Sequence, residues 1–296
     1  MSKLLILGAS SSVGRHLWNR LGPDRAIGTY RAHAIDGGRR FDSVSMRLAE
    51  VVRPGEASHA VILVADPQPD SCVRDPQASR RLNVEAMTRL IQDIWTLGMV
   101  PIFASTDYVF DGVKGNYVET DQARPILLYG AQKLEVEDFL TTSGQPHAIL
   151  RLSKVYGDVP GDGTQFAAWL DTILKGATTI RCATDQAFSP VHVGDVGDAF
   201  VAAAERGLSG LFHCTGNQRF TRLELLELLI TEIRRYRPVK MAVEHCSIHD
   251  FSMPEKRPVD TSMVAGKLMA ATSLKPLPVE ERVRRLVTRA IQGDAP

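Results

Sequence analysis

Tyr129 and Lys133 are the side chains whose types and spacing most clearly suggest proton transfer. They stand four residues apart in a stretch with helical periodicity, so both project from one face of a helix. A phenol ordinarily titrates near pH ~10, and a neighbouring ammonium favours the phenolate, so we expect Lys133 to lower the pKa of Tyr129. The pair is predicted to act as an acid–base catalyst on a carbonyl oxygen.

Thr106 is the third residue suited to this chemistry. It closes an apolar segment, 100–104, that is followed by Ser105 and is typical of a buried strand. Open α/β sheets bind ligands at the carboxyl ends of their strands, so the Thr106 hydroxyl is predicted to hold the substrate oxygen beside Tyr129. The alternative is that Thr106 only caps a turn and that Tyr129 and Lys133 form a surface pair.

A second set of residues is suited to bind phosphate. The small-residue segment 8–14, GASSSVG, joins the apolar run 4–7 to a helical stretch. A turn without large side chains lets a pyrophosphate approach the N-terminus of a helix, where free N–H groups and the dipole favour an anion. The spacing is that of GxxGxxG with serine in place of the middle glycine, and an ordinary turn with serine caps is the alternative. The predicted contacts are Gly8, Ser10, Ser11, Ser12, Val13 and Gly14.

Arg31 bears on the choice of dinucleotide. It follows the predicted strand 26–30, where NAD enzymes tend to place an acid and a basic residue accommodates the 2′-phosphate of NADP. Arg39 and Arg40 are near in sequence, and the nearest acid, Asp36, lies several residues further on. NADPH is therefore favoured over NADH, with a solvated surface charge as the alternative for Arg31.

The elements that must position these residues alternate between short apolar runs and segments of helical period. This alternation is typical of a parallel sheet flanked by helices, and it predicts an α/β fold with a doubly wound, Rossmann-type sheet in 1–155. The predicted strands are 4–7, 26–30, one that begins at 41, 59–65, 100–104 and 148–152, and the predicted helices are 13–21, 75–97 and 128–140.

The remainder of the chain, 156–296, is predicted to be mainly a smaller substrate-binding lobe, with part of 180–206 returning to the first domain. A helix near 166–174, a strand at 189–193, a helix opened by the capping pair Thr221 and Glu224, and a last helix at 279–291 are expected. No linker separates the halves, so the ligand site should lie between them. The segment 107–125 has little periodicity and is expected to be a functional or a disordered loop.

Composition narrows the class of partner. The chain has 296 residues, 44% of them hydrophobic, and a formal charge of +1, so nothing draws it to nucleic acid or to a membrane surface. No apolar run approaches the ~18 residues of a membrane span. The balance of charges favours a small-molecule partner. The cysteines are scattered without CxxC spacing, which favours reduced thiols in the cytoplasm. They are Cys72, Cys182, Cys214 and Cys246.

Several motifs together resemble extended short-chain dehydrogenases/reductases and, more narrowly, dTDP-4-dehydrorhamnose reductases. They are STDYVFDG at 105–112, YGAQK at 129–133, RLSKVYG at 151–157, DQAFSPVHVGDV at 185–196 and RPVDTS at 257–262, with Asn83 in the helix that follows the fourth predicted strand. The resemblance extends over most of the chain.

The resemblance implies hydride transfer from NADPH to the C4 keto group of a nucleotide-linked 6-deoxy sugar. Tyr129 would protonate the oxygen, Lys133 would bind the nicotinamide ribose, and Thr106 would hold the carbonyl. Asp42 and Ala65 are further expected cofactor contacts. The expected substrate contacts are Asp107, Tyr108, Lys154, Gln186 and Arg257. A homodimer is left open.

Departures from the family pattern keep the sugar and the activity open. Tyr108 stands where sugar-nucleotide dehydratases carry glutamate, and Arg31 disfavours the tightly held NAD of an epimerase. Lys154 stands where many rhamnose-forming members have tryptophan, and could pair with a substrate phosphate or carboxylate or be solvated. Ala65-Asp66-Pro67 replaces an alanine-rich turn.

Two other interpretations compete. One is a non-catalytic NADP-binding protein similar to the regulatory beta subunit of methionine adenosyltransferase. The other is a metal site formed by His245, Cys246 and His249, although a polar segment without metal is favoured because the spacing matches no zinc pattern. His192 and His213 are expected to be structural.

Overall fold

The computed structural model describes residues 3–157 and 164–292. The strands are β1 (Lys3–Leu7), β2 (Ala26–Tyr30), β3 (Arg39–Arg40), β4 (Ala57–Ile62), β5 (Val100–Thr106), β6 (Ala148–Leu152), β7 (Val155–Tyr156), β8 (Thr179–Ala183), β9 (Ala187–Phe188), β10 (Val191–His192), β11 (Gly210–Cys214), β12 (Phe220–Thr221) and β13 (Ala242–Cys246). The α-helices are α1 (Ser12–Arg25), α2 (Pro69–Arg74), α3 (Pro76–Arg80), α4 (Ala86–Thr96), α5 (Leu128–Thr142), α6 (Gln165–Leu174), α7 (Val193–Glu205), α8 (Arg222–Arg234), α9 (Gly266–Thr272) and α10 (Val279–Gln292). Short 3-10 turns η1 (Leu48–Glu50), η3 (Asp107–Val109) and η4 (Ile248–Asp250), and the π-helical turn η2 (Arg81–Glu85), complete the described elements.

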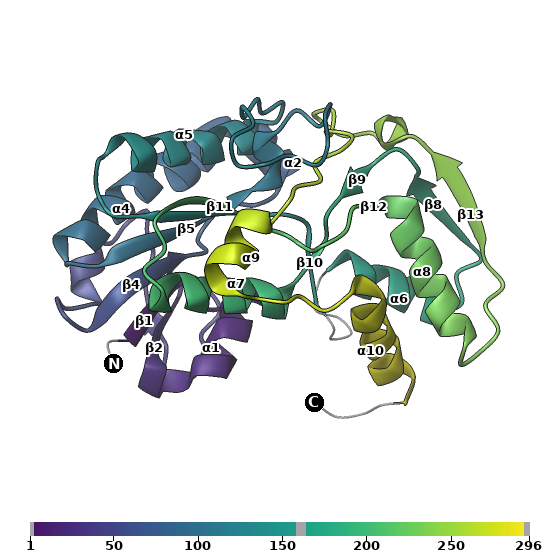
Figure 1. Ribbon diagram of the computed structural model, residues 1–296, viewed down its shortest axis with the longest axis horizontal. Helices are drawn as coiled ribbons and strands as arrows, with labels where there is room; N and C mark the ends of the chain where they lie inside the picture. The colour runs from purple at the N-terminus through teal and green to yellow at the C-terminus, as the bar shows by residue number, and fades with distance from the viewer. Residues whose placement is uncertain (1–2, 158–163, 293–296) are drawn as a thin grey trace.

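The central sheet has seven parallel strands within the described ranges, in the order β11-β6-β5-β4-β1-β2-β3. Side chains alternate across it, so Leu4 and Ile6 of β1 pack on one face and Leu5 and Leu7 on the other. Helices α1 and α7 cover the first face, and α4 and α5 cover the second (Figure 1). The predicted doubly wound parallel sheet is confirmed.

Some predicted element boundaries differ from the structure. In place of the strand expected to begin at 41 there is the two-residue β3, which ends before Phe41, and the strand expected at 59–65 is β4, which begins and ends earlier. Of the strand expected at 189–193 only β10 is extended, because the His192 ring accepts a hydrogen bond from Gly194 N at 3.0 Å and so begins α7. The helix expected over 75–97 is α3, η2 and α4 in succession.

A second lobe lies at the right of Figure 1 and has its own apolar core. Helices α6, α8 and α10 pack there with β8, and β13 pairs with β8. The capping pair predicted for α8 is confirmed, since Thr221 N donates to Glu224 at 2.6 Å and Glu224 N donates to the Thr221 hydroxyl at 3.2 Å. Between these helices the chain returns to the sheet, where α7, β11 and α9 join the core under α1.

The segment 107–125 is an ordered loop, so the disordered alternative is wrong. The Tyr117 ring stacks on Phe110 with 4.0 Å between ring centroids. Tyr117 N donates to Ser262 O at 2.9 Å, and the Tyr117 hydroxyl donates to Asp111 at 2.6 Å. The loop is thereby attached to the segment that precedes α9.

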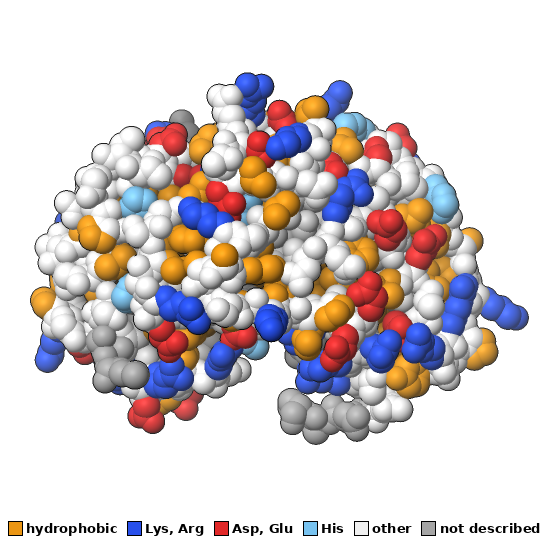
Figure 2. All heavy atoms as spheres, in the orientation of Figure 1, with side chains coloured by type: hydrophobic (Ala, Val, Ile, Leu, Met, Phe, Trp, Pro, Cys, Tyr) orange, Lys and Arg blue, Asp and Glu red, His pale blue; other side chains and the backbone are white. Residues whose placement is uncertain are grey.

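Acidic and basic side chains are interspersed over the face seen in Figure 2. In the part of the chain that the structure describes, no helix is long and apolar enough to span a bilayer.

Candidate active site

Tyr129 and Lys133 are buried on the first turns of α5, against the carboxyl end of β5. The Lys133 ammonium donates to Ala104 O at 2.8 Å, and lies 4.4 Å from the centre of the Phe103 ring and 6.0 Å from that of Tyr129. Ala104 is two residues before Thr106 on the same strand. The fold thus brings the predicted catalytic residues together at one strand end.

Gly130 allows this close approach. A Cβ atom at this position would lie 2.1 Å from Tyr108 O, on the turn that directly follows Thr106. Only a residue without a side chain lets α5 pack this tightly on η3. This role of Gly130 was not predicted from the sequence, although its place inside YGAQK is a signal for it.

The expected lowering of the Tyr129 pKa is wrong for the protein alone. Burial raises the pKa of Tyr129 well above its ordinary value, and the nearby Asp107 carboxyl raises it further. Burial also lowers the pKa of Lys133 to about 8. The Lys133 ammonium bonds to Ala104 O and not to the Tyr129 hydroxyl, so it does not offset the effect of burial on the Tyr129 pKa.

Thr106 and Asp107 form a hydroxyl–carboxyl pair at the end of β5. The Thr106 hydroxyl accepts a hydrogen bond from Tyr108 N at 3.2 Å, which caps the turn η3, and donates to Asp107 at 3.2 Å. The alternative in which Tyr129 and Lys133 form a surface pair is wrong, because both side chains are buried. Asp107 is buried and also accepts from the Thr261 hydroxyl at 2.8 Å. Burial raises the pKa of Asp107 to about 6. A substrate oxygen bound here could accept the hydrogen bond that the Thr106 hydroxyl donates to Asp107.

A cavity of about 540 Å³ opens at the carboxyl ends of β1, β2 and β4. We call it the dinucleotide groove. The predicted cofactor contacts that line it are Gly8, Ser10, Ser11, Arg31 and Ala65, whereas Ser12, Val13, Gly14 and Asp42 do not. Tyr129 and Lys133 lie outside its wall, on α5.

Ser11 and Gly14 explain how the turn after β1 works. The Ser11 hydroxyl accepts from Gly14 N at 3.1 Å and caps α1, which leaves its own proton for a phosphate oxygen. A Cβ on Gly14 would lie 2.2 Å from Gly8 O, so this glycine serves the packing of α1 on β1 rather than the groove wall.

Ser43 faces the groove where Asp42 was expected. The Asp42 carboxylate accepts from Val44 N at 3.0 Å, which holds it in its own turn. Ser43 lines the groove, and its buried hydroxyl has no hydrogen-bond partner among the described residues. Its carbonyl is fixed by the Arg89 guanidinium at 2.6 Å. The sequence held no signal for Ser43, because a serine after a strand is common.

Asn83 connects the groove to α5. Asp66 N donates to the Asn83 side chain at 2.8 Å, and the Asn83 amide donates to Gln132 at 2.8 Å. Gln132 precedes Lys133. The π-helical turn η2 carries Asn83, and such turns often occur at functional sites.

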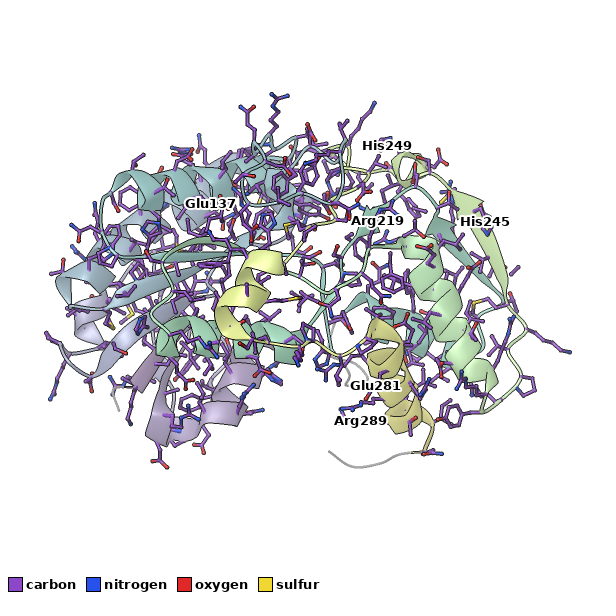
Figure 3. All side chains as sticks on the ribbon, viewed as in Figure 1. Glu137, Arg219, His245, His249, Glu281 and Arg289 are labelled. Carbon is purple, nitrogen blue, oxygen red and sulfur yellow. The ribbon has the colours of Figure 1, made fainter. Side chains whose placement is uncertain are left out.

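A buried ion pair joins the helix that carries Tyr129 and Lys133 to the neighbouring strand β6. The Arg151 guanidinium of β6 donates to Glu137 of α5 at 2.6 Å, and the Ser105 hydroxyl bonds the same carboxylate. Figure 3 labels Glu137 within the sheet domain. Ser105 is therefore used to join α5 to the strands.

Three cations lie near Asp107 and Tyr108. They are Lys154, Arg222 and Arg257, which we call the cationic cluster: the charge of each arginine acts on Lys154 and on Tyr108, and the charge of Lys154 acts on Asp107. Arg257 is buried and pairs with Asp70 of α2, and it also donates to Glu255 O at 3.1 Å. The Arg222 guanidinium bonds the amide oxygen of Gln165.

The predicted substrate contacts are thus brought near one another, except that Gln186 acts through its backbone. Gln186 is buried, and its carbonyl accepts from Arg222 N at 2.8 Å. Arg222 was missed from the sequence, where it reads as the first residue of an amphipathic helix.

The remaining candidates are histidines, of which His249 contacts a residue of the cationic cluster. Figure 3 labels His245 and His249 in the second lobe, and the His249 ring contacts Arg257 O at 3.1 Å. Among the described residues, no three histidine, cysteine or acidic side chains are grouped to hold a metal ion. His213 is buried with its pKa lowered to about 3 by burial, and His192 caps α7, so both are structural as expected.

The chain is similar to known proteins over most of its length. The family model described as "RmlD substrate binding domain" matches residues 2–291. Methionine adenosyltransferase 2 subunit beta of Bos taurus is 27% identical over 282 residues, which cover 89% of this chain and 77% of that protein. dTDP-4-dehydrorhamnose reductase of Sinorhizobium fredii is 26% identical over 294 residues, which cover 96% of each.

Solved structures share the fold. A hypothetical dTDP-4-dehydrorhamnose reductase from Sulfolobus tokodaii has a TM-score of 0.81 at 24% identity, covering 95% of this chain and 98% of that one. The dTDP-4-dehydrorhamnose reductase of Bacillus anthracis, in complex with NADP, has a TM-score of 0.82 at 21% identity, covering 97% and 99%.

Proposed function

This chain belongs to the RmlD substrate-binding-domain family, and on that premise we propose that it is an NADPH-dependent reductase of the C4 keto group of a nucleotide-activated sugar. A 6-deoxy sugar, as in its relatives named dTDP-4-dehydrorhamnose reductase, is the reference substrate. The observation that carries the proposal is the burial of Tyr129 and Lys133 together against the strand end that bears Thr106.

The dinucleotide groove fits NADPH. The Ser11 proton and the N-terminus of α1 suit the pyrophosphate, and the unpaired Ser43 hydroxyl suits the adenine end. Arg31 lines the groove, is exposed, and has no hydrogen bond or ion pair among the described residues. It is therefore available for a 2′-phosphate. NADPH would supply the hydride.

The protein residues supply orientation and the proton. The raised pKa of Tyr129 keeps its hydroxyl protonated near neutral pH. An alkoxide forming at C4 is a stronger base than a phenolate, so proton transfer from Tyr129 is downhill. Thr106 would hold the same oxygen, and a charged Lys133 would stabilise the phenolate left behind.

Arg222 and Arg257 are the proposed contacts for the diphosphate. Arg222 begins α8, Arg257 pairs with Asp70 of α2, and the charges of both act on Tyr108. Guanidinium groups bind phosphate oxygens well. The cytoplasm is the proposed location, since the four cysteines are unpaired.

The test is NADPH oxidation with a panel of nucleotide-activated 4-keto sugars, using Tyr129→Phe for comparison. Wild type should turn over at least one sugar. The variant should lose at least 100-fold in kcat (~2.7 kcal/mol) while binding NADPH as before. Equal turnover by the variant would exclude Tyr129 as the acid.

A non-catalytic NADP-binding subunit is the second candidate. The relatives named methionine adenosyltransferase 2 subunit beta match this chain about as well as the reductases do. The Lys133 contact with Ala104 O, rather than with the Tyr129 hydroxyl, also favours it. Tight NADPH binding without turnover on the whole panel would select this alternative.

A further inference from the structure

Lys154 differs from its neighbours in the cationic cluster because, in the described part of the chain, no side chain is hydrogen-bonded to its charged group. Arg257 has the Asp70 carboxylate and Arg222 has the Gln165 amide. Within the described ranges, the Lys154 ammonium makes no hydrogen bond or ion pair, although the backbone of Lys154 is fixed by Val191 N at 3.0 Å. The side chain reaches solvent. An anion could therefore reach it.

The strand register places Lys154 at the reacting end of the site. Thr106 of β5 is paired with Leu152 of β6, and Lys154 comes two residues later on the same edge. Adjacent strands lie ~4.8 Å apart, so Leu152 is beside Thr106 and the lysine follows it after one intervening residue. The charges of Lys154 and Asp107 act on each other.

The diphosphate is poorly placed to be the partner of Lys154. In a pyranose the nucleotide diphosphate is attached at C1, and C4 lies on the opposite side of the ring. If C4 is at Thr106 and Tyr129, C1 points away from this edge toward Arg222 and Arg257. An anion near Lys154 must then belong to the sugar itself.

We propose that the substrate sugar carries a carboxylate on C5, beside the reacting C4, and that Lys154 pairs with it. The inference rests on the proposed function and keeps its reaction, but replaces the methyl group of a 6-deoxy sugar by a carboxylate. Lys154 lies among other cations and protein atoms that disfavour its charge, so an anionic partner gains more here than at an open surface. Lys154 is then a specificity-determining residue.

The experiment compares two ligands that differ only in the group attached to C5, UDP-glucuronic acid with a carboxylate and UDP-glucose with a hydroxymethyl group, and the corresponding dTDP-sugar pair in parallel. Binding to the NADP-loaded protein is measured by calorimetry. The variant is Lys154→Gln. The control is Lys175→Gln, which removes the same charge from an exposed pair with Asp171 on α6.

Wild type and Lys175→Gln should bind the uronate at least tenfold more tightly than the neutral sugar, and Lys154→Gln should reduce that preference to less than threefold. Equal binding of both members of a pair by wild type, or an unchanged preference in Lys154→Gln, would overturn the inference and leave the reductase proposal standing. If no sugar nucleotide of either pair binds to the wild type, the proposed function fails with it.

Discussion

Asp107 shows how one buried carboxyl can set the protonation of the whole site. Its charge contributes to the raised pKa of Tyr129, and its own pKa is raised by burial to about 6. Near neutral pH the carboxyl is therefore mostly ionised, in surroundings that favour its neutral form.

Replacing Asp107 by Asn should stabilise the protein at pH 7 and have little effect at pH 3. The folded carboxyl holds its proton up to about pH 6, against an ordinary value of 3.8, so the folded state is penalised as pH rises through this window. The variant should gain on the order of 2 kcal/mol at pH 7. Urea unfolding at both pH values measures this, and a gain of equal size at pH 3 would contradict it.

Arg31 should decide the choice of cofactor. Reversing its charge in Arg31→Glu places a carboxylate where the 2′-phosphate of NADPH is expected, so we expect NADPH affinity to fall at least 30-fold and NADH affinity to change less than threefold. Fluorescence titration with both cofactors checks this. Arg40→Glu, also exposed but outside the groove wall, is the control.

At the scale of elements, two glycines fix how closely helices approach the strand ends. Gly14 holds α1 against Gly8, and Gly130 holds α5 against the turn after Thr106. Both contacts are with backbone oxygens, which cannot move aside as a flexible side chain could.

Gly130→Ala should displace α5 from η3 and so separate Tyr129 from Thr106. We expect kcat to fall at least tenfold while NADPH affinity changes less than threefold, because the groove wall lies on other elements. Steady-state kinetics and cofactor titration test this. Ala131→Gly, one residue along the same helix, controls for the general cost of altering α5; a similar loss in kcat there would weaken the argument.

Elements with strong local signals could be predicted from the sequence, and those that depend on tertiary contacts could not. Strand β6 and the cap of α8 were predicted correctly because an apolar run and a capping pair are local features. The strand expected at 189–193 was not predicted correctly, since the His192 side chain caps α7 and the helix begins at Val193. Ser43 and Arg222 acquire their place only when distant segments meet.

At the scale of the whole molecule, Asp70 and Arg257 join segments 187 residues apart in sequence. Glu255, close to Arg257, also accepts from Leu128 N at 3.0 Å at the start of α5. The segment that bears Glu255 and Arg257 therefore contacts both α2 and α5. No sequence pattern could have predicted that Arg257 already has a carboxylate partner.

Asp70→Asn should release Arg257 for the diphosphate. Since Asp70 competes with phosphate oxygens for the same guanidinium, UDP or dTDP should bind three- to tenfold more tightly to the variant. Calorimetry with the free nucleotides measures this. Asp75→Asn, at the cap of α3, serves as control, and weaker binding by Asp70→Asn would show that the pair instead holds Arg257 in a productive position.

The return of β11 to the sheet has a consequence for biosynthesis. Strand β6 is complete at Leu152, but the strand that covers its outer edge ends at Cys214, after α6, β8 and α7 have been translated. During that interval the ribosome-bound chain exposes unpaired backbone N–H and C=O groups along an apolar strand. The nascent protein is then most prone to aggregation, and chaperone protection would matter most.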